Sequence, residues 1–167
     1  MSNPRAAKGL QFGRRFTQEG VSPFDMFEYD YRDSVIKNPN GEKVFEMNNV
    51  EVPKQWSQIA TDILAQKYFR KAGVPQPDGS IGRETSVKQV AHRMANCWRV
   101  WGERYNYFSS DKDALVFYDE LVYSILNQAC VPNSPQWFNT GLHESYGITG
   151  KPQGHYFVDP KDRKLKK

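Results

Sequence analysis

The sequence has little of what marks a secreted, membrane-spanning or metal-binding protein. Its 167 residues include only two cysteines, Cys97 and Cys130, which form neither a disulfide framework nor a metal-ligand spacing. No apolar run approaches the length that crosses a membrane, and the N-terminal residues lack the apolar segment of a secretory signal. We therefore expect a soluble protein of the reducing cytoplasm, with both cysteines as free thiols in helical segments.

The sequence also lacks the features of a nucleic-acid binder, a phosphate-loop protein or a metal enzyme. The net charge is only +4, and the basic residues gather at the two ends of the chain instead of along one face. The glycines match neither a phosphate loop nor a dinucleotide-binding fingerprint. His92, His143 and His155 have no cysteine or carboxylate at metal-ligand spacing, so we expect no metal site.

The residues that are present predict one domain with a core rich in aromatic side chains, which make up 14% of the chain. Residues 1–20 are rich in Gly and Arg without periodicity and predict a flexible arm. Residues 21–52 predict a β-hairpin region, in which β-prone flanks at Phe27–Lys37 and Glu42–Val50 surround an Asn-Gly turn. Residues 161–167 predict a charged, solvated tail.

Residues 53–130 predict a helical domain of three main helices, so the expected fold class is mainly α with a small β-hairpin. The first helix is expected to begin with Pro53 at its first position, where no backbone N–H is needed. The second occupies Glu84–Tyr105, and the third begins at the capping-box-like pair Ser110 and Asp113. Apolar residues recur every three or four positions in all three, which indicates packing on a globular core.

The stretch NQACVPNSPQWFNTGLHESYG, residues 127–147, departs from this helical pattern. Pro132 and Pro135 bracket Asn133 and Ser134, and each proline pushes the residue before it toward extended geometry, which predicts a stiff corner. Two interpretations are open. The corner can present Ser134 Oγ and successive backbone N–H groups to an anion. It can also be a helix stop with a Ser or Asn cap, which the local pattern alone favours.

The segment PNSPQWFNTGL resembles the Asn-(Ser/Thr)-Pro…Asn-x-Gly segment in the large chain of ribonucleotide reductases. The upstream region RETSVKQVAHRMANCWRVWGERYNYFSSDKDALVFYDELVYSILNQ resembles the same region of the adenosylcobalamin-dependent, class II enzymes. VFEMNNVEVPKQWSQIATDILAQKYF and YGITGKPQGHYFVDP are similar to the flanks of those proteins. The resemblance runs in order from about Arg14 to Asp159, so it is far more specific than the short motif alone.

This resemblance implies a fold and a site. The helices would be the N-terminal helical domain of the catalytic chain, and residues 131–160 would form the substrate-segment loop and the first part of a ten-stranded α/β barrel. The positions that match the family's substrate segment are Asn133, Ser134, Pro135 and Gln136. Ser134 and neighbouring backbone N–H groups would bind the phosphates of a ribonucleoside di- or triphosphate, which the enzyme reduces to a 2′-deoxyribonucleotide for DNA precursor synthesis.

The family's thiyl-radical cysteine, reducing cysteine pair and Asn/Glu pair would lie further along the chain than this sequence reaches. Cys97 and Cys130 lie upstream of the substrate segment, so the resemblance assigns no catalytic residue to this chain. We therefore expect part of an oxidoreductase, an N-terminal piece of a split or excised enzyme. A complementing C-terminal reductase chain would bind adenosylcobalamin, and an external dithiol would reduce the whole enzyme. We expect no membrane partner and no direct contact with nucleic acid.

An alternative from another class is a non-catalytic helical interaction module that binds another protein, such as a replication or phage protein, through its basic ends. A third hypothesis, an independent nucleotide-binding domain, has less support, because the corner supplies only one edge of a phosphate site. Co-elution with a polypeptide that carries the missing cysteines would distinguish the first hypothesis from the interaction module.

Overall fold

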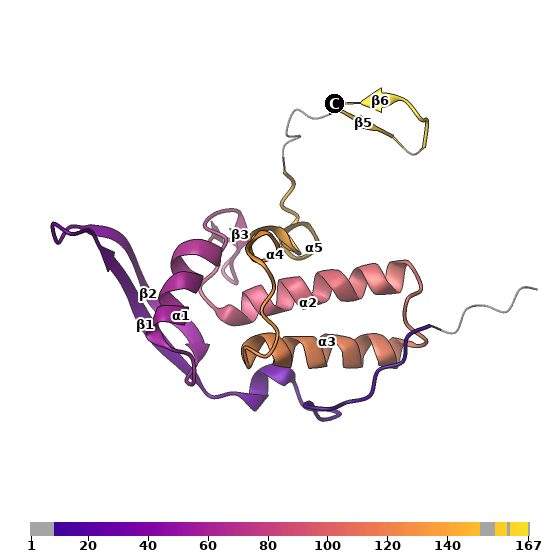
Figure 1. Cartoon of the computed structure of the whole chain (residues 1–167), viewed down its shortest axis with the longest axis horizontal. Helices are drawn as coiled ribbons and strands as arrows, with labels where there is room; N and C mark the ends of the chain where they lie inside the picture. The colour runs from indigo at the N-terminus through magenta and orange to yellow at the C-terminus, as the bar shows by residue number, and fades with distance from the viewer. Residues whose placement is uncertain (1–8, 151–155, 160, 167) are drawn as a thin grey trace, which may run out of the picture.

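The structure is a computed structural model that describes residues 9–150, 156–159 and 161–166. Two antiparallel helices, α2 and α3, form its centre, and a β-hairpin extends beyond one end of this pair (Figure 1). The elements in chain order are η1 (Pro23–Met26), β1 (Tyr29–Lys37), β2 (Lys43–Pro53), α1 (Gln58–Ile63), η2 (Leu64–Tyr68), β3 (Val74–Pro75), β4 (Ile81–Gly82), α2 (Val87–Arg104), α3 (Asp111–Leu126), α4 (Ser134–Asn139), α5 (Leu142–Tyr146), β5 (Phe157–Val158) and β6 (Leu165–Lys166).

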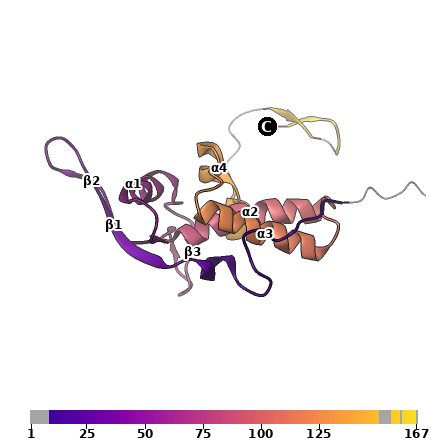
Figure 2. The same cartoon turned by 60° about the horizontal axis from the view of Figure 1, so that its bottom comes forward.

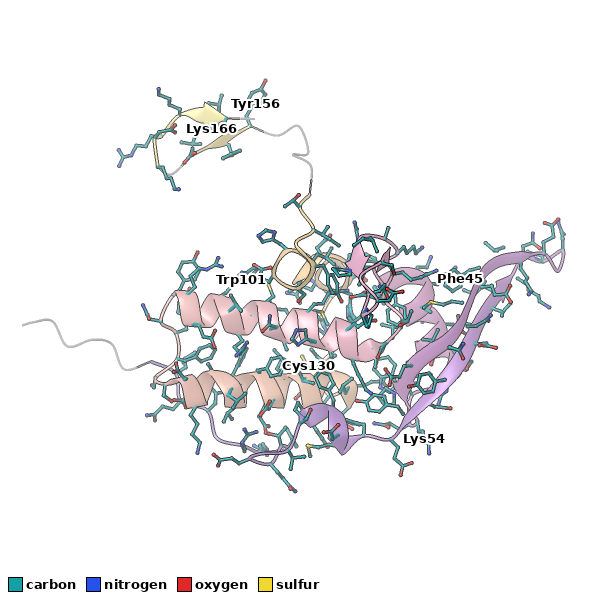
Figure 3. The ribbon with its side chains drawn as sticks, turned by 180° about the vertical axis from the view of Figure 1, so that it is seen from behind. Phe45, Lys54, Trp101, Cys130, Tyr156 and Lys166 are labelled. Atoms are coloured by element: carbon teal, nitrogen blue, oxygen red, sulfur yellow. The ribbon has the colours of Figure 1, made fainter. Side chains whose placement is uncertain are left out.

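Strands β1 and β2 confirm the predicted hairpin, and both views show it projecting from the helices (Figures 1 and 2). Its turn is closed by Asn38, whose Oδ1 accepts hydrogen bonds from the N–H groups of Asn40 and Glu42, at 3.0 Å each. Gly41 has a φ of +85°, a backbone conformation that favours glycine. Phe45 lies on β2 in Figure 3 and packs against the edge of the core.

The first helix differs from the prediction. Pro53 is the last residue of β2, opposite Tyr29, and does not begin a helix. The helix begins after Ser57, whose Oγ accepts a hydrogen bond from Ala60 N at 3.1 Å. A side-chain oxygen at this position satisfies one of the free N–H groups of the first turn, whereas Pro53 lacks such an oxygen. After six α-helical residues the chain continues as the π-helical turn η2.

Helices α2 and α3 confirm the second and third predicted helices. Ser86 and Gln89 form a capping box at the start of α2, and Ser110 Oγ accepts a hydrogen bond from Asp113 N at 3.2 Å at the start of α3. α3 ends at Leu126, so Cys130 lies beyond the helix instead of within it. The two helices lie side by side in both views (Figures 1 and 2), and buried apolar residues of both belong to one core cluster.

The core lies where the hairpin, α1, η2, α2, α3 and α4 meet. Its buried apolar members come from all of these elements: Met47, Val50, Val52, Trp56, Leu64, Ala65, Phe69, Val87, Val90, Ala91, Met94, Ala95, Val122, Ile125, Leu126 and Trp137. Trp137 belongs to the segment expected to be a loop, so this core anchors that segment. Trp101, at helical spacing on α2, lies outside this core and is 42% exposed near α5 (Figure 3).

Residues 9–20 run along α3, the third helix, instead of projecting from it. The carboxylate of Glu120 on α3 accepts hydrogen bonds from the backbone N–H groups of residues 15–17 at 2.9–3.1 Å. Three N–H groups that share one carboxylate fix the local path of the chain, because each would otherwise need water. Residues 1–8 of the predicted arm lie outside the described residues.

The chain after α3 is helical where a loop was expected. It forms α4 and α5, which pack against α2.

Tyr156 precedes β5 and Lys166 lies in β6, which pairs with β5 in an antiparallel hairpin (Figure 3). Every sheet among the described residues has two antiparallel strands, so these residues form no part of a barrel, contrary to the expectation for residues 131–160. The architecture is mixed α/β. Residues 151–155, 160 and 167 lie outside the description.

Within the described ranges, no helix combines the length and the apolar character that crossing a membrane requires.

Candidate functional site

The candidate site is the corner at the start of α4, where Asn133 is the N-cap and Ser134 is the first helical residue. The Asn133 carbonyl oxygen accepts hydrogen bonds from Gln136 N at 3.0 Å and from Trp137 N at 3.2 Å. Its side-chain oxygen also accepts from Gln136 N, at 3.4 Å. Pro135 is tolerated in the first turn, where a backbone N–H has no helical partner. The cap interpretation is confirmed in part, because Asn133 caps α4 and not the end of α3.

The four predicted binding residues, 133–136, form one continuous exposed segment. Trp137 follows them directly and is only 6% exposed. Its indole Nε1 donates a hydrogen bond to the carbonyl oxygen of Pro132 at 2.7 Å, which ties the two ends of the corner together. The polar side of the corner therefore faces solvent, while its aromatic side is fixed in the core.

The hydroxyl of Ser134 is paired with a tyrosine from a distant part of the chain. Its Oγ lies 3.0 Å from the Oη of Tyr68, the last residue of the π-helical turn η2. The Tyr68 ring packs against Trp137 and Phe138, with ring centroids 5.5 and 5.2 Å away. The sequence pattern placed Tyr68 in an apolar stripe and gave no indication of this contact.

A fully buried ion pair between α2 and the chain before it contacts the C-terminal end of α4. Arg93 on α2 and Glu84 have no exposed side-chain surface, and Arg93 Nε lies 2.7 Å from Glu84 Oε1. The Arg93 guanidinium also donates to the carbonyl oxygens of Trp137 at 2.6 Å and Thr140 at 2.8 Å. These carbonyls belong to the end of α4, where helical partners run out. The pair therefore completes the C-terminal hydrogen bonds of α4 and positions the corner.

Glu84 has further partners that keep its buried carboxylate satisfied. Arg70 N donates to Glu84 Oε2 at 2.7 Å, and the Tyr146 hydroxyl donates to Oε1 at 2.8 Å. Burial, together with the Glu84 charge, raises the pKa of Tyr146 well above its ordinary value. The Tyr146 hydroxyl therefore stays protonated as a donor, and it links α5 to the same buried pair.

Gly141, the glycine of the Asn-Thr-Gly sequence, is required by close packing between α4, α5 and α2. Its φ is +80°, and a Cβ at this position would lie 1.9 Å from the backbone oxygen of Arg93. No side chain fits at that separation. The glycine thus allows the chain to turn directly on the surface of α2, above the buried pair.

Two clefts border the corner. An apolar pocket of about 250 Å³ lies between α1, η2 and the corner, and its lining includes Ile63, Val131 and Trp137. A second cleft of about 340 Å³ is lined by Phe138 and by cationic side chains of residues 67–71. Tyr68 contributes to both. The corner therefore lies between an apolar surface and a basic one.

Among the described residues, the histidines and Cys97 are not part of the corner. His92 Nδ1 lies 2.7 Å from the hydroxyl of Tyr118, and among the described residues no three His, Cys, Asp or Glu side chains are placed to hold a metal ion. Cys97 is buried, and burial raises the pKa of its thiol to about 11. His143 lines a cleft beside α5, and His155 lies outside the described residues.

Comparison with known proteins identifies a family for most of the chain. Residues 30–128 match the family described as class II vitamin B12-dependent ribonucleotide reductase. A vitamin B12-dependent ribonucleotide reductase of Bradyrhizobium diazoefficiens is 45% identical over 187 residues, covering 95% of this chain and 15% of the relative. Similar proteins of Agrobacterium fabrum and Rhodopirellula baltica are 44% and 38% identical, covering 95% and 85% of this chain and 15% and 13% of theirs.

These matches place the chain among the ribonucleotide reductases. It belongs to the class II, vitamin B12-dependent family and corresponds to the N-terminal part of those enzymes. The chain spans about 15% of the length of the curated relatives that it matches over almost its whole sequence.

Proposed function

We propose that this chain supplies part of the substrate phosphate site of a B12-dependent ribonucleotide reductase. The observation that carries the proposal is the exposed Ser134 hydroxyl on a corner whose backbone is held in place by Trp137 and Arg93. A rigid hydroxyl can bind a phosphate oxygen without first losing conformational freedom. Asn133, Pro135 and Gln136 would shape the corner, and its exposed backbone would contribute N–H donors.

The role of the corner would be to position the substrate, not to break bonds. Holding a nucleotide by its phosphates fixes the ribose relative to the reacting groups, and this orientation alone lowers the barrier of the following step. Adenosylcobalamin would supply the radical chemistry that replaces the ribose 2′-hydroxyl by hydrogen, and an external dithiol would supply the reducing equivalents. We assign the cofactor to a complementing polypeptide and to none of the described residues.

The complementing polypeptide is the C-terminal part of a reductase, which would contribute the ten-stranded barrel. Its binding surface on this chain would include the apolar pocket beside the corner. Two apolar side chains that line this pocket are exposed to solvent, Ile63 at 46% and Val131 at 69%. Grouped apolar surface of this kind marks association sites in proteins. The same surface supports the alternative of a non-catalytic module that binds a different protein.

The test is a ribonucleotide-reduction assay with adenosylcobalamin and a dithiol. It is run with this chain alone, with the complementing chain alone, and with both together. We expect activity only when both are present. Activity of the complementing chain alone at the same level would refute the proposal that this chain contributes to the site.

A charge substitution then tests the corner itself. Ser134→Asp places a carboxylate at the start of α4, where a negative charge is compatible with the helix dipole. The carboxylate repels substrate phosphate, so we expect KM to rise about tenfold or more with kcat retained. Gln18→Glu adds the same charge on the exposed N-terminal segment and should leave KM unchanged. Equal KM values for the two variants would place the phosphates elsewhere.

A further inference from the structure

The π-helical turn η2 sets the position of Tyr68. Its defining hydrogen bond runs from Phe69 N to the carbonyl oxygen of Leu64, five residues back, at 3.0 Å. Such a turn holds one residue more than an α-helical turn, so it changes the direction of the side chains that follow, and it occurs often at functional sites. Here the turn directs Tyr68 to α4, where its ring packs against Trp137 and Phe138.

The Tyr68 and Ser134 hydroxyls form a pair with one O–H left over. Each hydroxyl carries one hydrogen, and either can donate across the 3.0 Å separation between Tyr68 Oη and Ser134 Oγ. One hydrogen is used inside the pair, so the other is free to donate outward. The hydrogen bond is solvent-exposed, so an incoming acceptor can reach the pair. A phosphate oxygen, which only accepts hydrogen bonds at neutral pH, fits this remaining donor.

Three cationic side chains share a cleft with Tyr68. Lys67, Arg70 and Lys71 line the cleft of about 340 Å³ that Tyr68 also lines. In the part of the chain that the structure describes, none of the three forms a salt bridge with a carboxylate. Their charges are therefore available to a ligand, and they attract an anion toward the hydroxyl pair.

From these observations we propose that Tyr68 is a second substrate-binding residue, which shares one phosphate oxygen with Ser134. This inference rests on the proposed function and extends it. Because either hydroxyl can act as the outward donor, each one replaces the other when its partner is removed. The phosphate contact is lost only when both hydroxyls are absent.

The inference predicts strong non-additivity in a double-mutant cycle. The assembled reductase is assayed with wild-type chain, Ser134→Ala, Tyr68→Phe and the double variant, and KM and kcat are measured for each. We expect each single variant to raise KM less than about threefold. The double variant should raise KM roughly tenfold to a hundredfold, the loss that follows when one hydrogen bond to a charged acceptor is removed. The value of kcat should not change.

The substitutions are conservative, and a matched control is present in the chain. Tyr68→Phe retains the ring that packs against α4, so unfolding by heat should be unaffected. Tyr105→Phe removes a hydroxyl from a tyrosine that is 60% exposed at the end of α2, and should leave KM unchanged in every background. A general effect of losing tyrosine hydroxyls would appear in this control.

The possible outcomes separate the inference from the proposed function. If Tyr68→Phe does not change KM in the Ser134→Ala background while Ser134→Asp still raises KM, Tyr68 does not bind phosphate. The inference about Tyr68 then fails, while the proposed function of the corner stands. If KM stays at the wild-type value in the double variant and in Ser134→Asp, the corner does not bind phosphate and both fail. A large increase confined to the double variant supports both.

Discussion

Replacing Arg93 by Met tests whether the buried ion pair holds the corner. Met has a similar length and fills most of the same space, but it removes the charge and all donors. Glu84 would keep hydrogen bonds from Arg70 N and the Tyr146 hydroxyl but lose the ion pair with Arg93. The carbonyl oxygens at the end of α4 would also lose their donor.

The expected cost follows from the complete burial of both side chains. Removing one partner of a buried pair leaves an uncompensated charge in a medium of low polarity, which destabilises proteins by about 3–5 kcal/mol. For a chain of this size, each kcal/mol lowers the melting temperature by about 2–4 °C. We therefore expect Arg93→Met to lower it by roughly 6–20 °C, and to disorder α4 before the rest of the fold.

The measurement is urea and thermal unfolding followed by circular dichroism, with two comparison variants. Lys54→Met breaks the pair between Lys54 and Glu28, whose side chains are 58% and 80% exposed, and should change little because solvent screens that pair. Adding Glu84→Gln to Arg93→Met removes the buried charge and should restore part of the loss. Two results would refute this role of the ion pair. One is a free energy of unfolding for Arg93→Met within about 1 kcal/mol of the wild-type value. The other is a double variant that is no more stable than Arg93→Met alone.

Two further predictions concern the backbone and the N-terminal segment. Gly141→Ala should lower the free energy of unfolding in urea by more than about 3 kcal/mol, because the new Cβ would meet the Arg93 backbone. The control Gly79→Ala has a similar φ of +81° but lies in open space, so it should lower the free energy of unfolding by only about 1–2 kcal/mol. Equal losses in the two variants would contradict this packing. Burial raises the pKa of Glu120, but hydrogen bonds from Thr17 and the N–H groups of residues 15–17 lower it more, to below 4.5. The lowered pKa means that Glu120 holds the segment above pH 4.5 and releases it as the pH falls through its folded-state pKa. Hydrogen exchange of the backbone amides of residues 15–17 should accelerate over that pH range. In the Glu120→Gln variant the same amides should already exchange fast at pH 7. If they stay protected in that variant, other contacts hold the segment.

The sequence predicted those elements whose stabilising contacts are local or periodic. The hairpin followed from an Asn-Gly turn between β-prone flanks, and Gly41 adopts the positive φ that such a turn uses. The helices α2 and α3 followed from apolar residues at helical spacing and from the serine caps Ser86 and Ser110. In each case the decisive interactions join residues only a few positions apart, so the pattern is visible in the sequence.

The prediction of the first helix failed where two local patterns competed. Pro53 suits both the end of a strand and the start of a helix, and pairing with Tyr29 extended β2 to include it. The apolar stripe from Trp56 to Tyr68 is continuous in sequence, but in the structure this segment is divided into the α-helix α1 and the π-helical turn η2. The two geometries differ by one residue per turn, which hydrophobic spacing over so short a segment does not resolve.

The sequence itself determined the hairpin and the two long helices, because these elements depend on residues close together in the chain. It also determined the family and the positions that match the family's substrate segment, because the resemblance runs in order along most of the sequence. Only the tertiary structure decided what the corner contacts. The Tyr68 hydroxyl that meets Ser134 comes from 66 residues upstream, and the Arg93 guanidinium that holds Trp137 comes from 44 residues upstream. Contacts across such separations are made when the packed core brings the elements together, so no short sequence pattern records them.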